Sequence, residues 1–259
     1  MSKIQYGKRP LYAPKKIYFI GDVHNEAEKL TSILEQIEPK LTEEDHVVFT
    51  GDLVDRGDDA ATTIDVLVAF IMRHYKQVFF VQGNHDWMLQ HYLTTGSHDW
   101  TTFLSRTLKS WQETWHLPDI APDTMVVELI QHGFYEITSR TIPYYETENV
   151  IATHAPFDLA TVLCHGGGQY QQDYLAREQN PAFTYLLERM LYDLKWGFTD
   201  ETTDIPVIDK FRVCGHQAAK SKHPRLFTYK AFIDTGCGLK RGNPLTCVVY
   251  PGKRYFQSR

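Results

Sequence analysis

The chain has 259 residues, 42% of them hydrophobic and 23% charged, with a formal net charge of −5. This composition suits one large globular domain with a full core, and we expect residues 1–259 to form it. No apolar run reaches the roughly 18 residues that a membrane span needs, no Lys/Arg-rich run suggests a nucleic-acid partner, and no apolar signal segment begins the chain, so we expect a cytoplasmic protein.

Three short apolar runs, at residues 17–20, 47–50 and 78–81, are predicted to be buried β-strands. Between them, apolar residues recur at helical spacing. These positions are Leu30, Ile33, Leu34 and Ile37, and then Ile64, Leu67, Val68 and Ile71. Such alternation of strands and helices predicts a parallel sheet with crossover helices, whose ligands gather at the carboxyl ends of the strands.

The segment from about residue 87 to 122 interrupts this rhythm. It holds four tryptophans and has a helical pattern, and we expect a helical insertion near the mouth of a site, with ordinary core packing as the alternative role of the tryptophans. The remaining strands are expected to form a second, mostly antiparallel sheet. They are predicted at residues 143–147, 150–153, 211–214, 231–234 and 245–250.

Each of the first three predicted strands ends at a polar block that offers ligands for a metal ion. The blocks are Gly21-Asp22-Val23-His24, Gly51-Asp52-Leu53-Val54-Asp55-Arg56-Gly57 and Gly83-Asn84-His85-Asp86. Two later histidines, in Thr153-His154-Ala155 and Gly215-His216-Gln217, also follow apolar runs. The glycine before each ligand is expected to let the backbone turn sharply away from the strand. One block alone would equally fit a turn with a capping aspartate, but five blocks in this order predict a two-metal hydrolase site.

Two divalent cations about 3.5–4 Å apart need one carboxylate that binds both. Asp52 is predicted to be that bridge, because it follows the middle one of the three strands. Asp22 and His24 are expected to complete the first metal site, and Asn84, His154 and His216 to complete the second. This mixed set of nitrogen and oxygen ligands suits manganese, iron, zinc, nickel or cobalt better than calcium.

The predicted reaction is attack of a water-derived hydroxide on phosphorus, in line with the leaving oxygen. Arg56 is expected to clamp the phosphate with its planar guanidinium. His85 is placed to protonate the leaving alkoxide. Asp55 is expected to hydrogen-bond His85, which would fix the tautomer of the ring and raise its pKa.

These motifs resemble those of the calcineurin-like metallophosphoesterases, and most of all the phosphoprotein phosphatase branch in its small bacterial and phage form. The resemblance covers residues 17 to 216, and Val54-Asp55-Arg56-Gly57 is its most specific part. It implies an α/β fold in which a β-sandwich of two mixed sheets is flanked by helices. It also implies the metal ligands named above, a phosphate-binding role for Arg56 and an acid dyad formed by Asp55 and His85.

The chain departs from the family pattern in three places. Asn25 replaces the glycine usual after the first histidine, and asparagine tolerates the left-handed backbone of that turn. Asp86 replaces the commoner glutamate, with no predicted effect. Gln217-Ala218 stands where other branches have a further histidine, which favours the phosphatase branch. A second phosphate-contacting residue is not obvious; Arg189 and Lys195 are candidates, each with a solvated surface charge as the alternative.

Three functions follow from this pattern. The first is a metal-dependent serine/threonine-type phosphatase, with manganese as the expected metal and a phosphorylated protein or small phosphoester as substrate. The alternative is a symmetrical bis(5'-nucleosyl)-tetraphosphatase, whose C-terminal region resembles Asp234-Thr235-Gly236-Cys237 followed by Leu245-Thr246-Cys247. A binding module without catalysis is the third, and the complete set of ligand and dyad residues argues against it.

Overall fold

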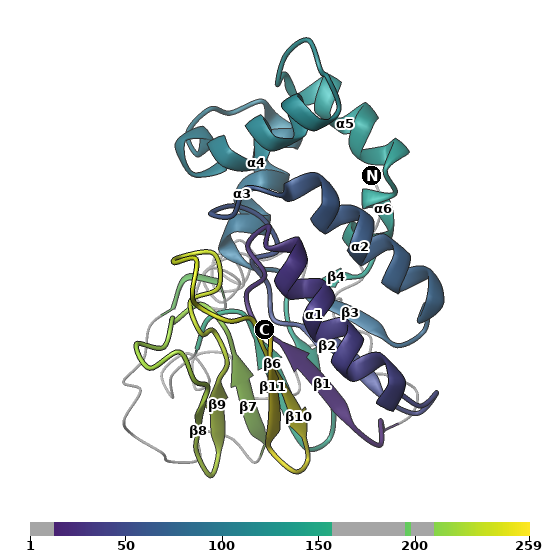
Figure 1. Ribbon diagram of the computed structural model, residues 1–259, viewed down its shortest axis with the longest axis vertical. Helices are drawn as coiled ribbons and strands as arrows, with labels where there is room; N and C mark the ends of the chain where they lie inside the picture. Colours follow the sequence, from purple (N-terminus) through teal and green to yellow (C-terminus); the bar gives the residue numbers. More distant parts are fainter. Residues whose placement is uncertain (1–12, 157–194, 198–209) are drawn as a thin grey trace, which may run out of the picture.

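The computed structural model describes residues 13–156, 195–197 and 210–259, which form two β-sheets and the helices packed against them (Figure 1). The strands are β1 (Ile17–Ile20), β2 (His46–Phe49), β3 (Val78–Val81), β4 (Thr141–Ile142), β5 (Tyr145–Glu146), β6 (Val150–Thr153), β7 (Phe211–Cys214), β8 (Arg225–Leu226), β9 (Lys230–Phe232), β10 (Thr246–Tyr250) and β11 (Arg254–Gln257). The helices are α1 (Ala27–Ile37), α2 (Ala60–Arg73), α3 (Asn84–Thr95), α4 (Thr101–Thr114), α5 (Pro122–Gln131) and α6 (Phe134–Thr138).

The first sheet has the strand order β11-β10-β1-β2-β3-β4. Strands β1, β2 and β3 are parallel to one another, with β2 in the middle, as the alternating pattern predicts. The prediction for residues 245–250 was wrong in one respect, because β10 belongs to this sheet and pairs antiparallel with β1. The edge of β1 that faces away from β2 needs a hydrogen-bonding partner, and β10 satisfies it from the far end of the sequence.

The second sheet has the order β5-β6-β7-β9-β8 and is mixed, not mostly antiparallel. Its two inner pairs, β6 with β7 and β7 with β9, are parallel, and only the outer pairs are antiparallel. Parallel pairing requires a long connection between the two strands. Residues 154–210 join β6 to β7, and such a long crossover lets the chain return in the same direction.

Packing explains why the strands of the first sheet are continuous apolar runs. In β1, Ile17 and Phe19 contact residues of the second sheet, whereas Tyr18 and Ile20 belong to the core beneath the helices. All four side chains are at most 2% exposed. A strand covered on both faces carries no polar alternation, which is the pattern in the sequence. The fold is therefore a sandwich of two mixed sheets with helices outside, as expected.

A helix follows each of the three motif strands, and in Figure 1 α1 passes in front of the first sheet with α2 beside it. Helices α3 to α6 lie between β3 and β4 in sequence, and we call them the helical part. In Figure 1 they occupy the upper part of the molecule, away from the turns that join β8 to β9 and β10 to β11 at the bottom. Among the tryptophans of this helical part, core packing is shown for Trp111. Trp111 is fully buried and stacks on Trp115 at 5.5 Å, whereas Trp87 and Trp100 are only partly buried.

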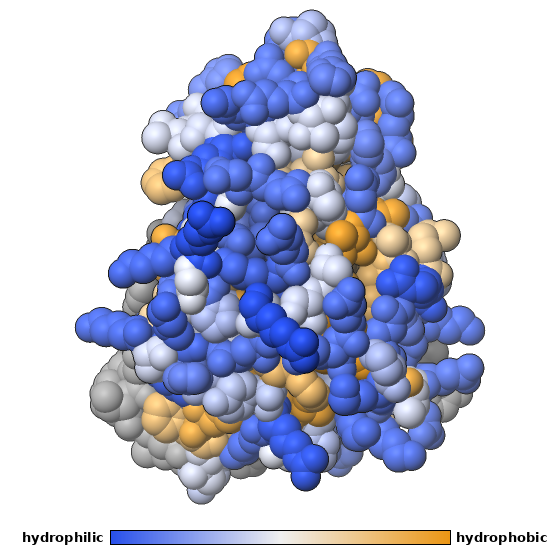
Figure 2. Space-filling model, in the orientation of Figure 1, coloured by the Kyte–Doolittle hydropathy of each residue, from blue (hydrophilic) through white to orange (hydrophobic). Residues whose placement is uncertain are grey.

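The face of the molecule shown in Figure 2 is mainly hydrophilic, and its hydrophobic residues lie in separate patches. Among the described helices, none combines the length and the apolar character that crossing a bilayer requires.

Candidate active site

Six predicted ligand side chains meet at the carboxyl ends of the strands. They come from loops after β1, β2, β6 and β7 and from the first residue of α3. Their donor atoms form two groups that share one residue, Asp52, and within each group the atoms lie within 4.8 Å of one another. The first group is Asp22, His24 and Asp52, and the second is Asp52, His154 and His216, with Asn84 beside it.

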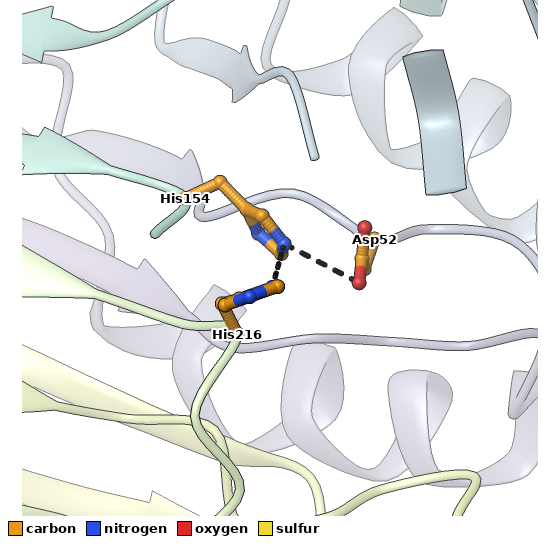
Figure 3. A group of neighbouring side chains, drawn as sticks. All are labelled: Asp52, His154 and His216. Carbon is orange, nitrogen blue, oxygen red and sulfur yellow. Dashed lines mark hydrogen bonds and ion pairs between the residues drawn. The ribbon is translucent and has the colours of Figure 1, made fainter. Parts of the chain in front are cut away.

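In the second group, four atoms that can bind a metal ion converge on one point. His154 Nε2 lies 3.3 Å from Asp52 Oδ2 and 3.2 Å from His216 Nδ1 (Figure 3). It also lies 2.9 Å from Asn84 Oδ1. The other ring nitrogen, His154 Nδ1, is 2.8 Å from the carbonyl oxygen of Thr50 and donates to it. Ligand atoms around an ion bound at about 2.1 Å are themselves about 3.0–3.4 Å apart, so this spacing fits a metal ion.

The first group contains a buried nitrogen that faces two carboxylates. His24 Nδ1 donates to the carbonyl oxygen of Val54 at 2.8 Å, so the lone pair of the neutral ring is on Nε2. That atom lies 4.0 Å from Asp22 Oδ2 and 3.7 Å from Asp52 Oδ2, and it has no hydrogen-bond partner among the described residues. Burial lowers the pKa of His24 to about 3, which keeps the ring neutral. A bound cation would satisfy this nitrogen and both acids.

Asp52 is held as a carboxylate although it is only 1% exposed. Burial opposes its ionisation, but the charges of His154 and His85 outweigh burial and hold the pKa of Asp52 well below its usual range. Its Oδ1 accepts the backbone N–H of His85 at 3.0 Å, in the first turn of α3. The positive end of a helix favours a negative charge at that position.

Two further acids, Asp22 and Asp234, are buried beside Asp52. Burial raises the pKa of Asp22 well above its usual range, and the nearby carboxylate of Asp234 raises it further. Asp234 follows β9 and is 2% exposed. Asp234 is not among the predicted site residues, because no strand-end motif of the ligand type surrounds it in the sequence.

The predicted dyad is formed. His85 Nδ1 donates to Asp55 Oδ2 at 2.7 Å, and His85 Nε2 lies 4.0 Å from Asp52 Oδ2. Burial lowers the pKa of His85, but the charges of Asp52 and Asp55 outweigh burial, so the net shift is upward. Burial raises the pKa of both Asp22 and Asp234, and Arg56 is near enough for its positive charge to oppose part of this rise. The structure thus brings all nine predicted site residues to one place.

Comparison with known proteins now decides the family. The family model described as calcineurin-like phosphoesterase matches residues 15–220. The chain belongs to this family. Calcineurin-like phosphoesterases typically use a binuclear centre of divalent metal ions, and the two groups that share Asp52 could bind such a pair. The chain is accordingly a phosphoester hydrolase.

Individual relatives within the calcineurin-like phosphoesterases are distant. The chain is 23% identical to the bis(5'-nucleosyl)-tetraphosphatase PrpE [asymmetrical] of Oceanobacillus iheyensis, over 93% of this chain and 90% of that protein. Among solved structures, a cold-active protein tyrosine phosphatase has a TM-score of 0.56 and 16% identity, with 97% of this chain and 79% of that chain covered. A protein serine/threonine phosphatase from Saccharomyces cerevisiae has a TM-score of 0.54 and 12% identity, with coverages of 98% and 83%. At these identities the structural likeness shows the fold alone.

The backbone of this phosphoesterase is left-handed at several of the site residues. Asn25 has a φ of +54°, as the replacement of glycine predicted, and His24, Asp52 and His216 have φ values of +50°, +54° and +63°. Such conformations cost free energy and are typical of functional sites. They explain why the side chains leave the strand ends toward one point.

Glycines before the ligands serve two different purposes. Gly51 has a φ of +100°, which fits the expected sharp turn. Gly83 has an ordinary φ of −84°, and the turn explanation is wrong for it. A Cβ atom on Gly83 would collide with the carboxylate and backbone nitrogen of Asp52, and one on Gly215 would collide with the carboxylate of Asp22. At these two positions glycine provides room for the acids.

The structure also shows a residue whose role the sequence did not reveal. Thr107, in the middle of α4, donates its hydroxyl hydrogen to Asp55 Oδ1 at 2.7 Å and accepts the backbone N–H of Asp55 at 2.9 Å. Its oxygen also accepts from Asn25 Nδ2 at 2.8 Å. Thr107 therefore ties the helical part to the dyad and to the first motif. No local signal could have identified it, because its partners are 52 and 82 residues away.

The two candidates for a second phosphate contact have different outcomes. Arg189 lies outside the described residues. Lys195 is partly buried and not a solvated surface charge, and its Nζ donates to Gln82 Oε1 at 3.4 Å and lies 5.6 Å from the ring centre of Trp87.

Asp86, for which the sequence predicted no effect, holds two motif loops together by hydrogen bonds. Its Oδ2 accepts the backbone N–H groups of Asp52 at 2.8 Å and Gly83 at 3.0 Å, and its Oδ1 accepts that of Leu53 at 2.9 Å. The carboxylate thus fastens the loop after β2 to the start of α3. A carboxylate is suited to this place because both of its oxygens accept hydrogen bonds.

We predict that Asp86→Asn lowers the free energy of unfolding by about 1–3 kcal/mol, because an amide offers one acceptor oxygen where three N–H groups converge. Urea denaturation of the metal-free protein measures this change. The matched control is Asp99→Asn at an exposed position. Equal midpoints for the two variants would show that Asp86 does not fasten the loop.

Proposed function

We propose that this phosphoesterase holds two divalent cations with the predicted ligands and hydrolyses its substrate with a water-derived nucleophile. The observation that supports this most is the sharing of Asp52 between two ligand groups. One group would consist of Asp22, His24 and Asp52. The other would consist of Asp52, Asn84, His154 and His216. Manganese remains the expected metal, since the ligand set mixes imidazole with oxygen donors.

The bound cations would lower the pKa of water and offset charge on the phosphoryl oxygens. The protein would supply the remaining chemistry. The guanidinium of Arg56 would hold the phosphate in line with the nucleophile. His85 would give the proton on Nε2 to the leaving oxygen, while Asp55 keeps its hydrogen bond to Nδ1 and thereby fixes the tautomer.

For the substrate, our first candidate is a dinucleoside tetraphosphate. The relatives named as tetraphosphatases match about nine-tenths of both chains, which supports this class over the phosphoprotein predicted first from the motifs. Those relatives are named asymmetrical, whereas the sequence analysis proposed the symmetrical reaction. The serine/threonine phosphatase remains the second candidate, supported by the Val54-Asp55-Arg56-Gly57 motif.

Hydrolysis of diadenosine tetraphosphate by the manganese-loaded protein tests the substrate class. We expect a higher kcat/KM for this dinucleotide than for a phosphoserine peptide. Chromatography of the products distinguishes AMP plus ATP, which asymmetrical cleavage gives, from two ADP molecules. A preference for the peptide would restore the phosphatase as the first candidate.

Replacing the shared carboxylate tests the metal centre. We expect Asp52→Asn to lower kcat with p-nitrophenyl phosphate more than about 100-fold, since removing even an outer partner of a metal ligand costs about 10–100-fold. Chelation with EDTA should abolish wild-type activity, and added manganese should restore it. The control is Asp58→Asn in the same loop, where the side chain is 88% exposed. A rate in Asp52→Asn equal to that of the control would refute the two-metal proposal.

The dyad is tested by the dependence on the leaving group. We expect Asp55→Asn to lower kcat about 10²–10⁴-fold for an alkyl phosphate, whose poor leaving group needs a proton, and much less for p-nitrophenyl phosphate. His85→Asn should show the same pattern. Equal losses on both substrates would argue against proton donation by His85.

A further inference from the structure

An aromatic side chain lies beside the proposed proton donor and has no part in the chemistry described so far. Phe103, on α4, is 56% exposed, and its ring centre is 6.4 Å from that of His85, with the rings nearly perpendicular at 80°. An exposed phenylalanine alone carries little meaning. This one lies beside His85, the residue proposed above to protonate the leaving group.

Phe103 extends a cluster of aromatic rings. Trp100 is 6.2 Å from Phe103, and Trp87 is 6.2 Å from Trp100, both between ring centres. Trp100 and Trp87 are partly buried and pack against the core. Trp100 contacts Phe103 directly, so the exposed ring is linked to the core through it. We call the surface formed by Phe103 and Trp100 the aromatic shelf.

The position of the shelf relative to His85 is fixed by α4. Phe103 and Thr107 are four residues apart on the same face of this helix. Thr107 is hydrogen-bonded to Asp55, and Asp55 is hydrogen-bonded to His85. A ring held in this way loses little conformational freedom when a ligand stacks on it. The contact therefore costs less entropy and contributes more to the binding free energy.

We propose that the aromatic shelf binds the nucleobase of the departing nucleotide and so selects nucleoside polyphosphates among phosphoesters; this inference rests on the proposed phosphoester hydrolysis. A leaving oxygen protonated by His85 must come within about 2.6–3.2 Å of it, so the group attached to that oxygen passes Phe103. Bases stack on exposed aromatic rings whatever their identity.

The charge near the shelf also suits a nucleotide. The ammonium group of Lys195 lies 5.6 Å from the ring centre of Trp87, which joins it to the same cluster. A polyphosphate chain carries several negative charges next to its base, and a cation here would attract it. A serine or threonine leaving group offers neither the ring nor the charge.

The test uses manganese-loaded protein and pairs of probes that differ in the base. The first readout is the ratio of kcat/KM for diadenosine tetraphosphate to that for glycerol 2-phosphate. The second is the ratio of dissociation constants for ribose 5-phosphate and AMP, measured by calorimetry. Phe103→Ala should lower both ratios by about 5- to 150-fold, the range found when one base–aromatic stack is removed.

Matched variants separate stacking from other effects. Phe103→Tyr keeps a ring and should keep the wild-type ratios, whereas Phe103→Leu keeps only apolar area and should lower them. Tyr135→Ala, on α6, removes an aromatic residue that is 67% exposed and should change neither ratio.

Each other outcome has a definite meaning. Ratios for Phe103→Ala within about twofold of wild type would overturn the shelf and leave the proposed hydrolysis standing. A wild type that hydrolyses no phosphoester would refute the proposed function, while the two dissociation constants still decide whether the shelf holds a base. If Phe103→Ala impairs only hydrolysis of a phosphotyrosine peptide, the shelf recognises an aryl leaving group, and the nucleobase assignment is wrong.

Discussion

The rest of the site depends on keeping one buried acid, Asp52, ionised and in place. A carboxylate with 1% exposure is costly unless hydrogen bonds and opposite charges surround it. Here the N-terminus of α3 holds one oxygen, three histidines face the other, and Asp86 accepts the backbone N–H of Asp52. Asp22 and Asp234 are also buried nearby, so three acids lie where bound cations would offset their charge.

The strand order puts these groups together, and the helical part adds the means of discrimination. Because β2 lies between β1 and β3, the loop after β2 is in reach of ligands from both sides. Helix α4 then reaches the same loop from the helical part through Thr107. One face of α4 thus contacts Asp55 and, one turn earlier, carries Phe103 beside His85, where the proposed leaving group would depart. In this proposal, metal chemistry comes from the strand ends and substrate choice from the helices.

The parts of the structure that the sequence predicted are those with a local signal. Strands β1, β2 and β3 are short apolar runs, each followed within two residues by a glycine and then by ligand residues. The meeting of these ligands at one sheet edge could therefore be inferred. The bonds from Asp86 to the loop after β2 and from Thr107 to Asp55 could not be inferred, because these partners are 33, 34 and 52 residues away in the sequence. The placement of β10 failed for the same reason, since pairing with β1 depends on an edge formed some 230 residues earlier.

Anomalous diffraction from crystals grown with manganese tests the central claim most directly. The account predicts two peaks per chain, each within about 2.0–2.6 Å of an oxygen of Asp52, with His24 beside one and His154 beside the other. A single peak, or two peaks of which only one touches Asp52, would contradict it.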